Sequence, residues 1–239
     1  MNYNELNFNV TSRERELSMS DAFPILMRKV YVWMTLALAL TGATAYGVAT
    51  SPGVLTALYS NSVLLWGLVI AEFAIVFGVS AAINKLSLTT ATLLFVLYSV
   101  INGALFSSIF VIYTMSSIAS VFFITAGTFG VMALVGYTTK KDLSSMGKIL
   151  FMALIGIIIA TIVNIFLKSS GIEMIVSYLG VLIFVGLTAY DTQKIKNMLL
   201  MAPDASEGAQ KMALLGALTL YLDFINLFIY LLRIFGRRE

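Results

Sequence analysis

The chain has 239 residues, of which 59% are hydrophobic and 11% are charged, and its net charge is +3. Soluble domains carry about 25% charged residues, so this composition, with a mean hydropathy of +0.94, excludes a soluble catalytic domain. The sequence has no cysteine and no histidine, which excludes disulfides, Cys-ligated metals and an imidazole that acts as base, metal ligand or pH sensor.

Seven apolar runs are long enough to cross a bilayer, which takes about 20 helical residues each. They lie at 30–50, 63–83, 89–112, 117–137, 149–167, 174–199 and 212–235. Because the runs are continuous and do not alternate with polar residues, they predict an all-α integral membrane protein and not a β-barrel. We divide the chain into a cytoplasmic N-terminal tail (1–29), a seven-helix transmembrane bundle (30–235) and a short C-terminal tail (236–239).

The distribution of basic residues predicts the orientation. If the N-terminus is inside, the inner segments hold Arg13, Arg15, Arg28, Lys29, Lys85, Lys140, Lys141, Lys148, Lys194, Lys196 and Lys211, and the outer ones hold Lys168, Arg233, Arg237 and Arg238. Short cytoplasmic loops are rich in Lys and Arg, so this excess favours a cytoplasmic N-terminus. The three C-terminal arginines fit an outer position less well. The sequence therefore leaves open a re-entrant span with both chain ends inside.

Three acidic residues fall within the predicted spans, where an ionisable side chain is costly and usually functional. They are Glu72 in span two, Asp191 in span six and Asp223 in span seven. Glu207, in the connection between the last two spans, lies midway between the two aspartates in the sequence, so Asp191 and Asp223 should lie at similar depth on antiparallel helices. Asn226 follows Asp223 by three residues and shares its helical face.

Two adjacent carboxylates in a medium of low dielectric constant do not both stay ionised, so the pair would share one proton and sense pH without histidine. Together with Asn226 and backbone carbonyls, their oxygens also suit a hard cation such as Ca²⁺. A structural role is the alternative. Asp191 has Lys194 three residues later and could form a surface salt bridge, and Glu72 could form a buried hydrogen bond or ion pair instead of lining a pore. We interpret Lys85, at the inner end of span two, as a basic residue that fixes the orientation of the span in the membrane.

Two segments carry a resemblance to a known family. The segment from Gly186 to Lys196, which contains Thr-Ala-Tyr-Asp-Thr-Gln-Lys, and the segment from Leu220 to Phe228 resemble the sixth and seventh spans of the Bax inhibitor-1 family, also called the transmembrane Bax inhibitor motif family, in its bacterial branch. The resemblance implies six helices around a central C-terminal helix, and a pH-sensitive calcium leak controlled by Asp191 and Asp223. It also implies an acidic residue near the pore, which Glu72 matches. A basic residue at the cytoplasmic end of the same helix would hold the closed state by pairing with the two aspartates, and Lys85 is the nearest candidate for this latch.

The function we expect is therefore a pH-sensitive calcium leak channel, not an enzyme, in a multi-pass protein of the bacterial inner membrane. Its partners would be the bilayer, calcium ions, protons and other membrane proteins, with no nucleic acid and no cofactor beyond Ca²⁺ as the bound or transported ion. A proton-coupled transporter and a non-transporting membrane regulator or assembly factor are the alternatives. An intramembrane aspartyl protease fits poorly, because Asp223 follows Leu-Tyr-Leu and not Gly-x-Gly.

Overall fold

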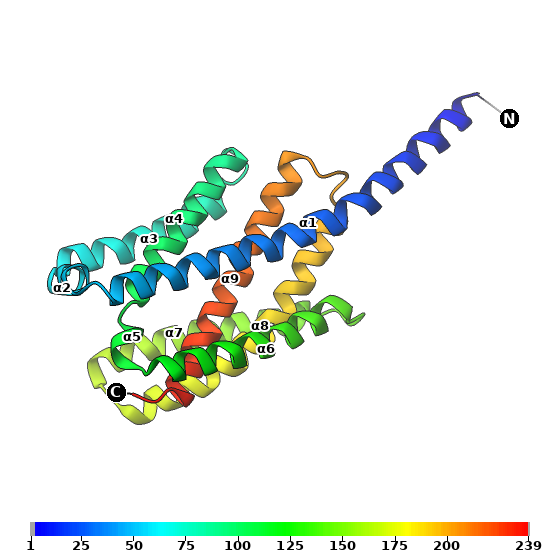
Figure 1. The fold of residues 1–239 in the computed structure, drawn as a ribbon. Coiled ribbons are helices and arrows are strands. Elements are labelled where there is room, and N and C mark those ends of the chain that lie inside the picture. The colour runs from blue at the N-terminus through cyan, green and yellow to red at the C-terminus, as the bar shows by residue number, and fades with distance from the viewer. Residues whose placement is uncertain (1–2, 239) are drawn as a thin grey trace.

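The structure, a computed structural model, describes the backbone of residues 3–238 and the side chains of residues 21–238. Nine helices are formed in this part of the chain (Figure 1): α1 (Tyr3–Ala49), α2 (Pro52–Ser60), α3 (Ser62–Ala82), α4 (Leu88–Phe106), α5 (Ile109–Ile112), α6 (Met115–Thr138), α7 (Ser144–Leu167), α8 (Ser170–Leu200) and α9 (Glu207–Phe235). Seven spans are long and apolar enough to cross a membrane, with α4 and α5 sharing one of them. The prediction of an all-α protein with seven transmembrane helices is confirmed.

Polar side chains in the short connections define where several helices begin. The Asn61 side chain accepts hydrogen bonds from the first amides of α3, and Ser87 and Thr114 cap α4 and α6 in the same way. Such caps satisfy amides that have no partner within their own helix. At the other end of α7, Lys168 adopts a left-handed conformation with φ of 50° and turns the chain into α8.

The structure differs from the predicted elements in three places. The first helix begins at Tyr3, well before the apolar run that starts near residue 30, because the charged residues of this segment are themselves good helix formers. The short helix α2, absent from the prediction, links α1 to α3. The third span is interrupted between Phe106 and Ile109. The division into tail, bundle and tail stays a prediction, and Glu239 lies outside the described residues.

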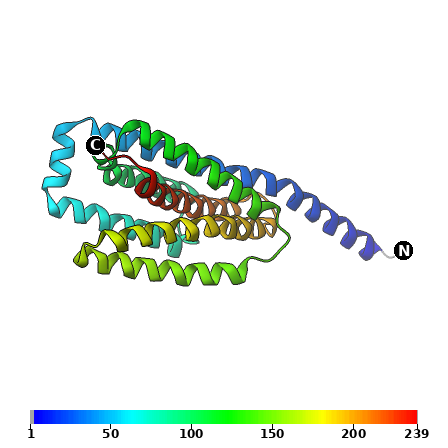
Figure 2. The ribbon, with the colours of Figure 1, turned by 90° about the horizontal axis from the view of Figure 1, so that it is seen from below.

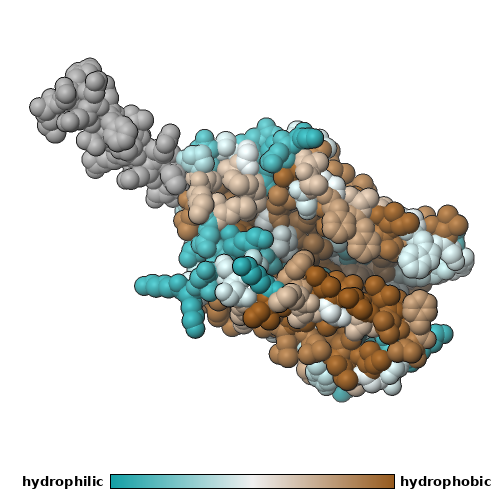
Figure 3. Space-filling model, turned by 180° about the vertical axis from the view of Figure 1, so that it is seen from behind, coloured by the Kyte–Doolittle hydropathy of each residue, from teal (hydrophilic) through white to brown (hydrophobic). Residues whose placement is uncertain are grey.

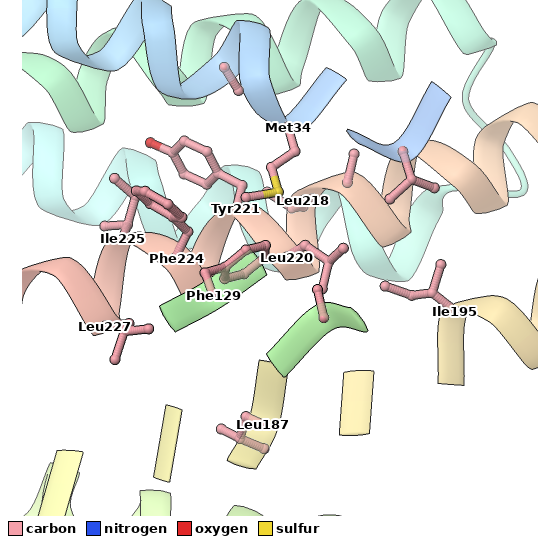
Figure 4. Packing of buried hydrophobic residues seen from close by; sticks show 14 of the residues in the cluster. Met34, Phe129, Leu187, Ile195, Leu218, Leu220, Tyr221, Phe224, Ile225 and Leu227 are labelled. Carbon is pink, nitrogen blue, oxygen red and sulfur yellow. The ribbon is translucent and has the colours of Figure 1, made fainter. Parts of the chain in front are cut away.

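The last helix, α9, forms the core of the bundle. In its most apolar stretch 67% of the residues are buried, against 6% in the corresponding stretches of α3 and α7. It packs against α1, α4, α6 and α8, while α3 and α7 pack mainly against α4 and α8 (Figures 1 and 2). Figure 4 shows Leu220, Tyr221, Phe224 and Leu227 of α9 among buried side chains of the neighbouring helices. The arrangement is thus centred on α9, with α3 and α7 at its periphery.

The two chain ends lie at opposite ends of the bundle (Figure 1). We call the end formed by the loops 83–87, 139–143 and 201–206 the N-terminal face. The C-terminal face is formed by the segments 50–61, 107–114 and 168–169, with residues 236–238. Viewed from behind, hydrophilic residues gather towards the N-terminal face and apolar residues cover the middle of the bundle (Figure 3).

Residues 236–238 form a strap that fastens the end of α9 to the start of α6. The Thr114 amide donates to the Arg237 carbonyl (3.1 Å), and the Arg237 amide donates to the Ser117 hydroxyl (2.9 Å). Arg238 forms a β-bridge with Tyr113 and an ion pair of 3.6 Å with Glu173. The C-terminal arginines therefore lie on the C-terminal face, and the fold has no re-entrant span among the described residues.

We expect the N-terminal face to be cytoplasmic, because it carries most of the basic residues of the loops. Fusions to the end of the chain test this in a bacterial host. Alkaline phosphatase, which folds outside the cytoplasm, should be active there, and green fluorescent protein should stay dark. A fluorescent C-terminal fusion would contradict the predicted orientation.

Candidate ion site

The hairpin of α8 and α9 brings Asp191 and Asp223 together. Both side chains are buried, with exposed fractions of 9% and 4%, and each carboxyl group is within hydrogen-bonding reach of the other. The loop of residues 201–206 joins the two helices. Asp191 lies nine residues before Leu200, the end of α8, and Asp223 lies sixteen residues after Glu207, the start of α9, so the two carboxyl groups are not equally far from the turn. The two side chains meet as predicted, but the turn is not centred on Glu207, which is the first residue of α9.

The pair faces a cavity of about 650 Å³ between α7, α8 and α9. The residues that line it are Gly147, Lys148, Phe151, Leu154, Ile158, Phe184, Leu187, Tyr190, Asp191, Lys194, Thr219, Leu222, Asp223, Asn226 and Tyr230. Lys148 and Lys194 stand towards the N-terminal face, one on α7 and one on α8. Tyr230 lies at the other end and stacks on Phe184, with ring centroids 5.9 Å apart.

The salt bridge that Lys194 could form with Asp191 is not observed. Among the described side chains, neither Asp191 nor Asp223 has a basic partner within 4.0 Å. The Lys194 ammonium lies instead 5.9 Å from the centroid of the Tyr190 ring. The Oδ2 atom of Asp223 is buried without a hydrogen-bond donor, which is costly for an ionised carboxylate. The geometry therefore favours a pair that holds a proton or a cation.

Asn226 lies one turn after Asp223 on α9 and lines the same cavity. Its amide nitrogen donates to the Leu222 carbonyl at 2.8 Å, so its side-chain oxygen is left as an acceptor. Among the described residues, no three acidic, histidine or cysteine side chains lie close enough together to hold a metal ion. The site thus offers two carboxylates and one amide oxygen.

Glu72 belongs to a second polar cluster on the other side of α9. It is half-buried next to the Asn102 amide of α4, and that amide donates to the Tyr98 hydroxyl at 3.0 Å. Nearby, the hydroxyls of Tyr221 and Thr41 are hydrogen-bonded at 2.8 Å. Because Tyr221 precedes Asp223 by two residues, the two side chains point to opposite sides of α9. The structure does not bring Glu72 into the cavity of the aspartate pair.

Lys85 also lies away from the pair. It is exposed in the loop between α3 and α4 and does not line the cavity of the aspartates. The latch expected of Lys85 is therefore not formed in this structure. The basic residues that do line the cavity are Lys148 and Lys194. Lys148 was missed as a site residue because, from the sequence, it reads as one more loop charge.

Three glycines allow close approach around the site. A side chain at Gly136 of α6 would meet the backbone carbonyl of Ala189, and one at Gly147 of α7 would meet the Tyr190 ring. Gly180 gives room to Tyr230 in the same way. Small residues at helix contacts are a common packing device in membranes. Here they set the position of the α8 segment that carries Asp191.

The fold and the site define a polytopic membrane protein whose last two helices present a buried pair of carboxyl groups to a cavity. Comparison with known proteins agrees with this class. The family model described as "Inhibitor of apoptosis-promoting Bax1" matches residues 24–239, and the chain belongs to this family, the Bax inhibitor-1 family.

Bacterial relatives match almost the whole chain. The inner membrane protein YbhL of Escherichia coli K12 is 56% identical over 215 residues, which cover 89% of this chain and 92% of YbhL. A protein of Borreliella burgdorferi is 45% identical over 96% of this chain and 98% of its own length. A protein of Rickettsia prowazekii is 40% identical over 96% and 97%. The name of the first relative and the seven spans agree with the predicted multi-pass location in a bacterial inner membrane.

Proposed function

We propose that the protein is a calcium leak channel whose opening depends on the protonation of the pair formed by Asp191 and Asp223. The observation that carries the proposal is the burial of two adjacent carboxyl groups, without a basic partner within 4.0 Å among the described side chains, at the wall of a cavity of about 650 Å³. Buried carboxyl groups in a membrane protein are costly, and they commonly mark a pathway for ions or protons.

The ligand set suits a calcium ion that passes through and is not retained. Ca²⁺ takes six to eight oxygen ligands, and the pair with Asn226 supplies a minority of them. The remainder would come from water and backbone carbonyls. Such a site binds calcium weakly, which is what a leak requires, because an ion must leave the site as readily as it enters.

The proton and the cation compete for the same oxygens. At low pH the pair shares a proton, carries less negative charge and keeps α9 against α8. As the pH rises the pair loses this proton. The repulsion between two adjacent carboxylates then favours movement of α9 and entry of a cation. Calcium flux should therefore increase from about pH 6 to about pH 8.

The outer end of the cavity is closed by aromatic packing. Tyr230 stacks on Phe184 and fills the space beside Gly180. The Arg233 guanidinium lies over the Tyr230 ring, 5.5 Å from the ring centroid. An ion moving between the cavity and the C-terminal face would have to pass this tyrosine. Because Tyr230 and Asp223 lie on the same helix, a change in the position of α9 also changes the packing of Tyr230 on Phe184, which couples the charge state of the pair to this end of the path.

Calcium entry into liposomes that contain the purified protein and a calcium-sensitive dye tests the proposal. We expect the flux of the native chain to rise with pH, and the ratio of flux at pH 8 to flux at pH 6 to fall to about one in Asp191→Asn and in Asp223→Asn, because neither retains a coupled pair.

Asp204→Asn is the matched control, since it makes the same chemical change in the exposed loop of the same hairpin. Hydrogen bonds from the Ser206 hydroxyl and amide lower the pKa of Asp204 from its ordinary value, so this residue stays ionised throughout the tested range and its replacement should leave the pH dependence intact. Persistence of the pH dependence in both site variants would place the sensor elsewhere. Absence of calcium flux at every pH would favour a proton-coupled transporter or a non-transporting regulator.

A further inference from the structure

A second, larger cavity lies between α1 and α6, on a different side of α9 from most of the aspartate site. It has a volume of about 700 Å³ and is bordered by Pro24 to Leu38 of α1 and by Phe122 to Tyr137 of α6, with Phe224 of α9 at its base. Figure 4 shows Met34, Phe129 and Phe224 converging there from these three helices. Helices α1 and α6 both pack on α9, and the cavity occupies the space between α1 and α6.

The cavity opens sideways, towards the lipid. Leu134 and Gly130 of its wall are exposed on the surface of α6, and Leu134 is 61% accessible. Towards the C-terminal face it adjoins a second apolar cavity of about 270 Å³, which shares Leu38, Phe122 and Phe224 with it. Near the N-terminal face, Phe23 and Tyr137 stack across the gap with centroids 6.3 Å apart. The result is an apolar furrow that runs along the bundle and is closed at one end by aromatic rings.

Of the residues that line the larger cavity, Arg28 carries a charge and the others do not. It also borders an adjoining surface pocket of about 360 Å³ with Tyr31 and Thr35. Arg28 is exposed and has no ion pair with any described side chain. Nearby on the same face, the Lys196 ammonium donates to the Tyr137 carbonyl at 2.7 Å. The head of the furrow is thus positively charged, whereas its length is apolar.

The spacing of these features matches one leaflet of a bilayer. From Arg28 to Leu38, ten helical residues rise about 15 Å at 1.5 Å per residue. Half of the hydrocarbon core is also about 15 Å thick. If the backbone of Arg28 lies at the edge of the hydrocarbon core, with its side chain directed to the phosphates, an acyl chain in the furrow ends near Leu38, at the middle of the membrane. Tyr31 and Tyr137 stand at the level where aromatic side chains meet the headgroups.

We propose that the furrow between α1 and α6 is a binding site for an anionic phospholipid of the leaflet at the N-terminal face. The Arg28 guanidinium binds the phosphate, since its planar donors match phosphate oxygens, and one acyl chain lies along Met34, Phe129 and Phe224. Because Phe224 directly follows Asp223 on α9, the bound chain also supports the helix that carries one carboxyl group of the candidate ion site. The lipid site does not depend on calcium transport.

Native mass spectrometry of the whole purified protein tests the site, with phosphatidylglycerol and phosphatidylcholine added in equal amounts. The native chain should retain phosphatidylglycerol in preference to phosphatidylcholine. Arg28→Gln should reduce the retained phosphatidylglycerol at least about fivefold, which corresponds to about 1 kcal/mol. Lys140→Gln removes an exposed charge on the same face and should retain as much as the native chain.

A pair of glycine variants tests the acyl-chain part of the site. An added Cβ meets no atom within 4 Å at Gly127 or at Gly130, but Gly130 lines the cavity and Gly127 does not. Gly130→Leu should fill the furrow and displace the lipid, and Gly127→Leu should not. Equal lipid retention in the two glycine variants, or in Arg28→Gln and Lys140→Gln, would overturn the proposal. So would a dimer lost in Gly130→Leu without any change in bound lipid, because the furrow would then be a helix interface.

Discussion

Replacement of Gly136 by alanine is expected to destabilise the bundle severely. The new Cβ would overlap the backbone carbonyl of Ala189, and a backbone atom in the middle of α8 cannot move without shifting the helix. Overpacked cores lose about 1 to 3 kcal/mol, and more where the neighbour is rigid, so we expect a loss of about 3 kcal/mol. The midpoint of thermal unfolding in detergent, followed by circular dichroism, measures the effect.

Gly127→Ala is the control for this substitution. Gly127 lies on the same helix, and a Cβ there meets no atom within 4 Å. Both replacements gain the same helix propensity, about 1 kcal/mol, so the difference between them isolates the clash with α8. Equal unfolding midpoints for Gly136→Ala and Gly127→Ala would show that α6 and α8 do not approach as closely as the structure indicates.

The second large effect is expected at Tyr221, whose side chain is fully buried on α9. Its ring lies edge-on to Phe95 and Tyr98, with centroids 5.7 and 5.8 Å away, and its hydroxyl is hydrogen-bonded to Thr41. Truncation of a buried aromatic residue to alanine costs about 3 to 5 kcal/mol. We expect Tyr221→Ala to lower the free energy of unfolding by this amount, as measured by denaturant titration in mixed micelles.

Two further variants separate the contributions of the ring and the hydroxyl. Tyr221→Phe keeps the ring and loses one hydrogen bond, so its cost should be about 1 kcal/mol. Tyr178→Ala makes the same truncation on the lipid-facing side of α8, where 54% of the side chain is exposed, and should cost much less. A Tyr221→Ala protein as stable as Tyr178→Ala would contradict the central position of α9.

The transmembrane spans and the neighbouring positions of the two helices that carry the aspartates follow from the sequence for simple physical reasons. Long apolar runs have one stable arrangement in lipid, since every backbone polar group must be satisfied within the helix. The sequence also predicts that Asp191 and Asp223 lie within two helices joined by a short connection, which makes these helices neighbours. Their distances from the turn differ, since Asp191 lies nine residues before the end of α8 and Asp223 sixteen residues after the start of α9, so the contact between them depends on how the two helices pack.

Other features depend on contacts between segments far apart in the chain, and periodicity does not report these. The extension of α1 to Tyr3 and the short helix α2 lie in polar or mixed segments, where no apolar run marks a helix. Lys148 faces the aspartate cavity because Gly147 lets α7 approach Tyr190. Glu72 was grouped with the pair by its depth, yet α9 separates them, since depth along the membrane normal gives no direction within the plane.

The strap of residues 236–238 constrains how α9 can move. Its backbone hydrogen bonds to Thr114 and Ser117 and the ion pair between Arg238 and Glu173 hold the C-terminal end of the helix to α6 and α8. A rod held at one end can swing but cannot slide, and its displacement grows with the distance from the pivot. Asp223 lies twelve residues from Phe235, or about 18 Å along the axis. A tilt of a few degrees would thus move this carboxyl group by about an ångström, whereas Tyr230, closer to the pivot, would move less than half as far.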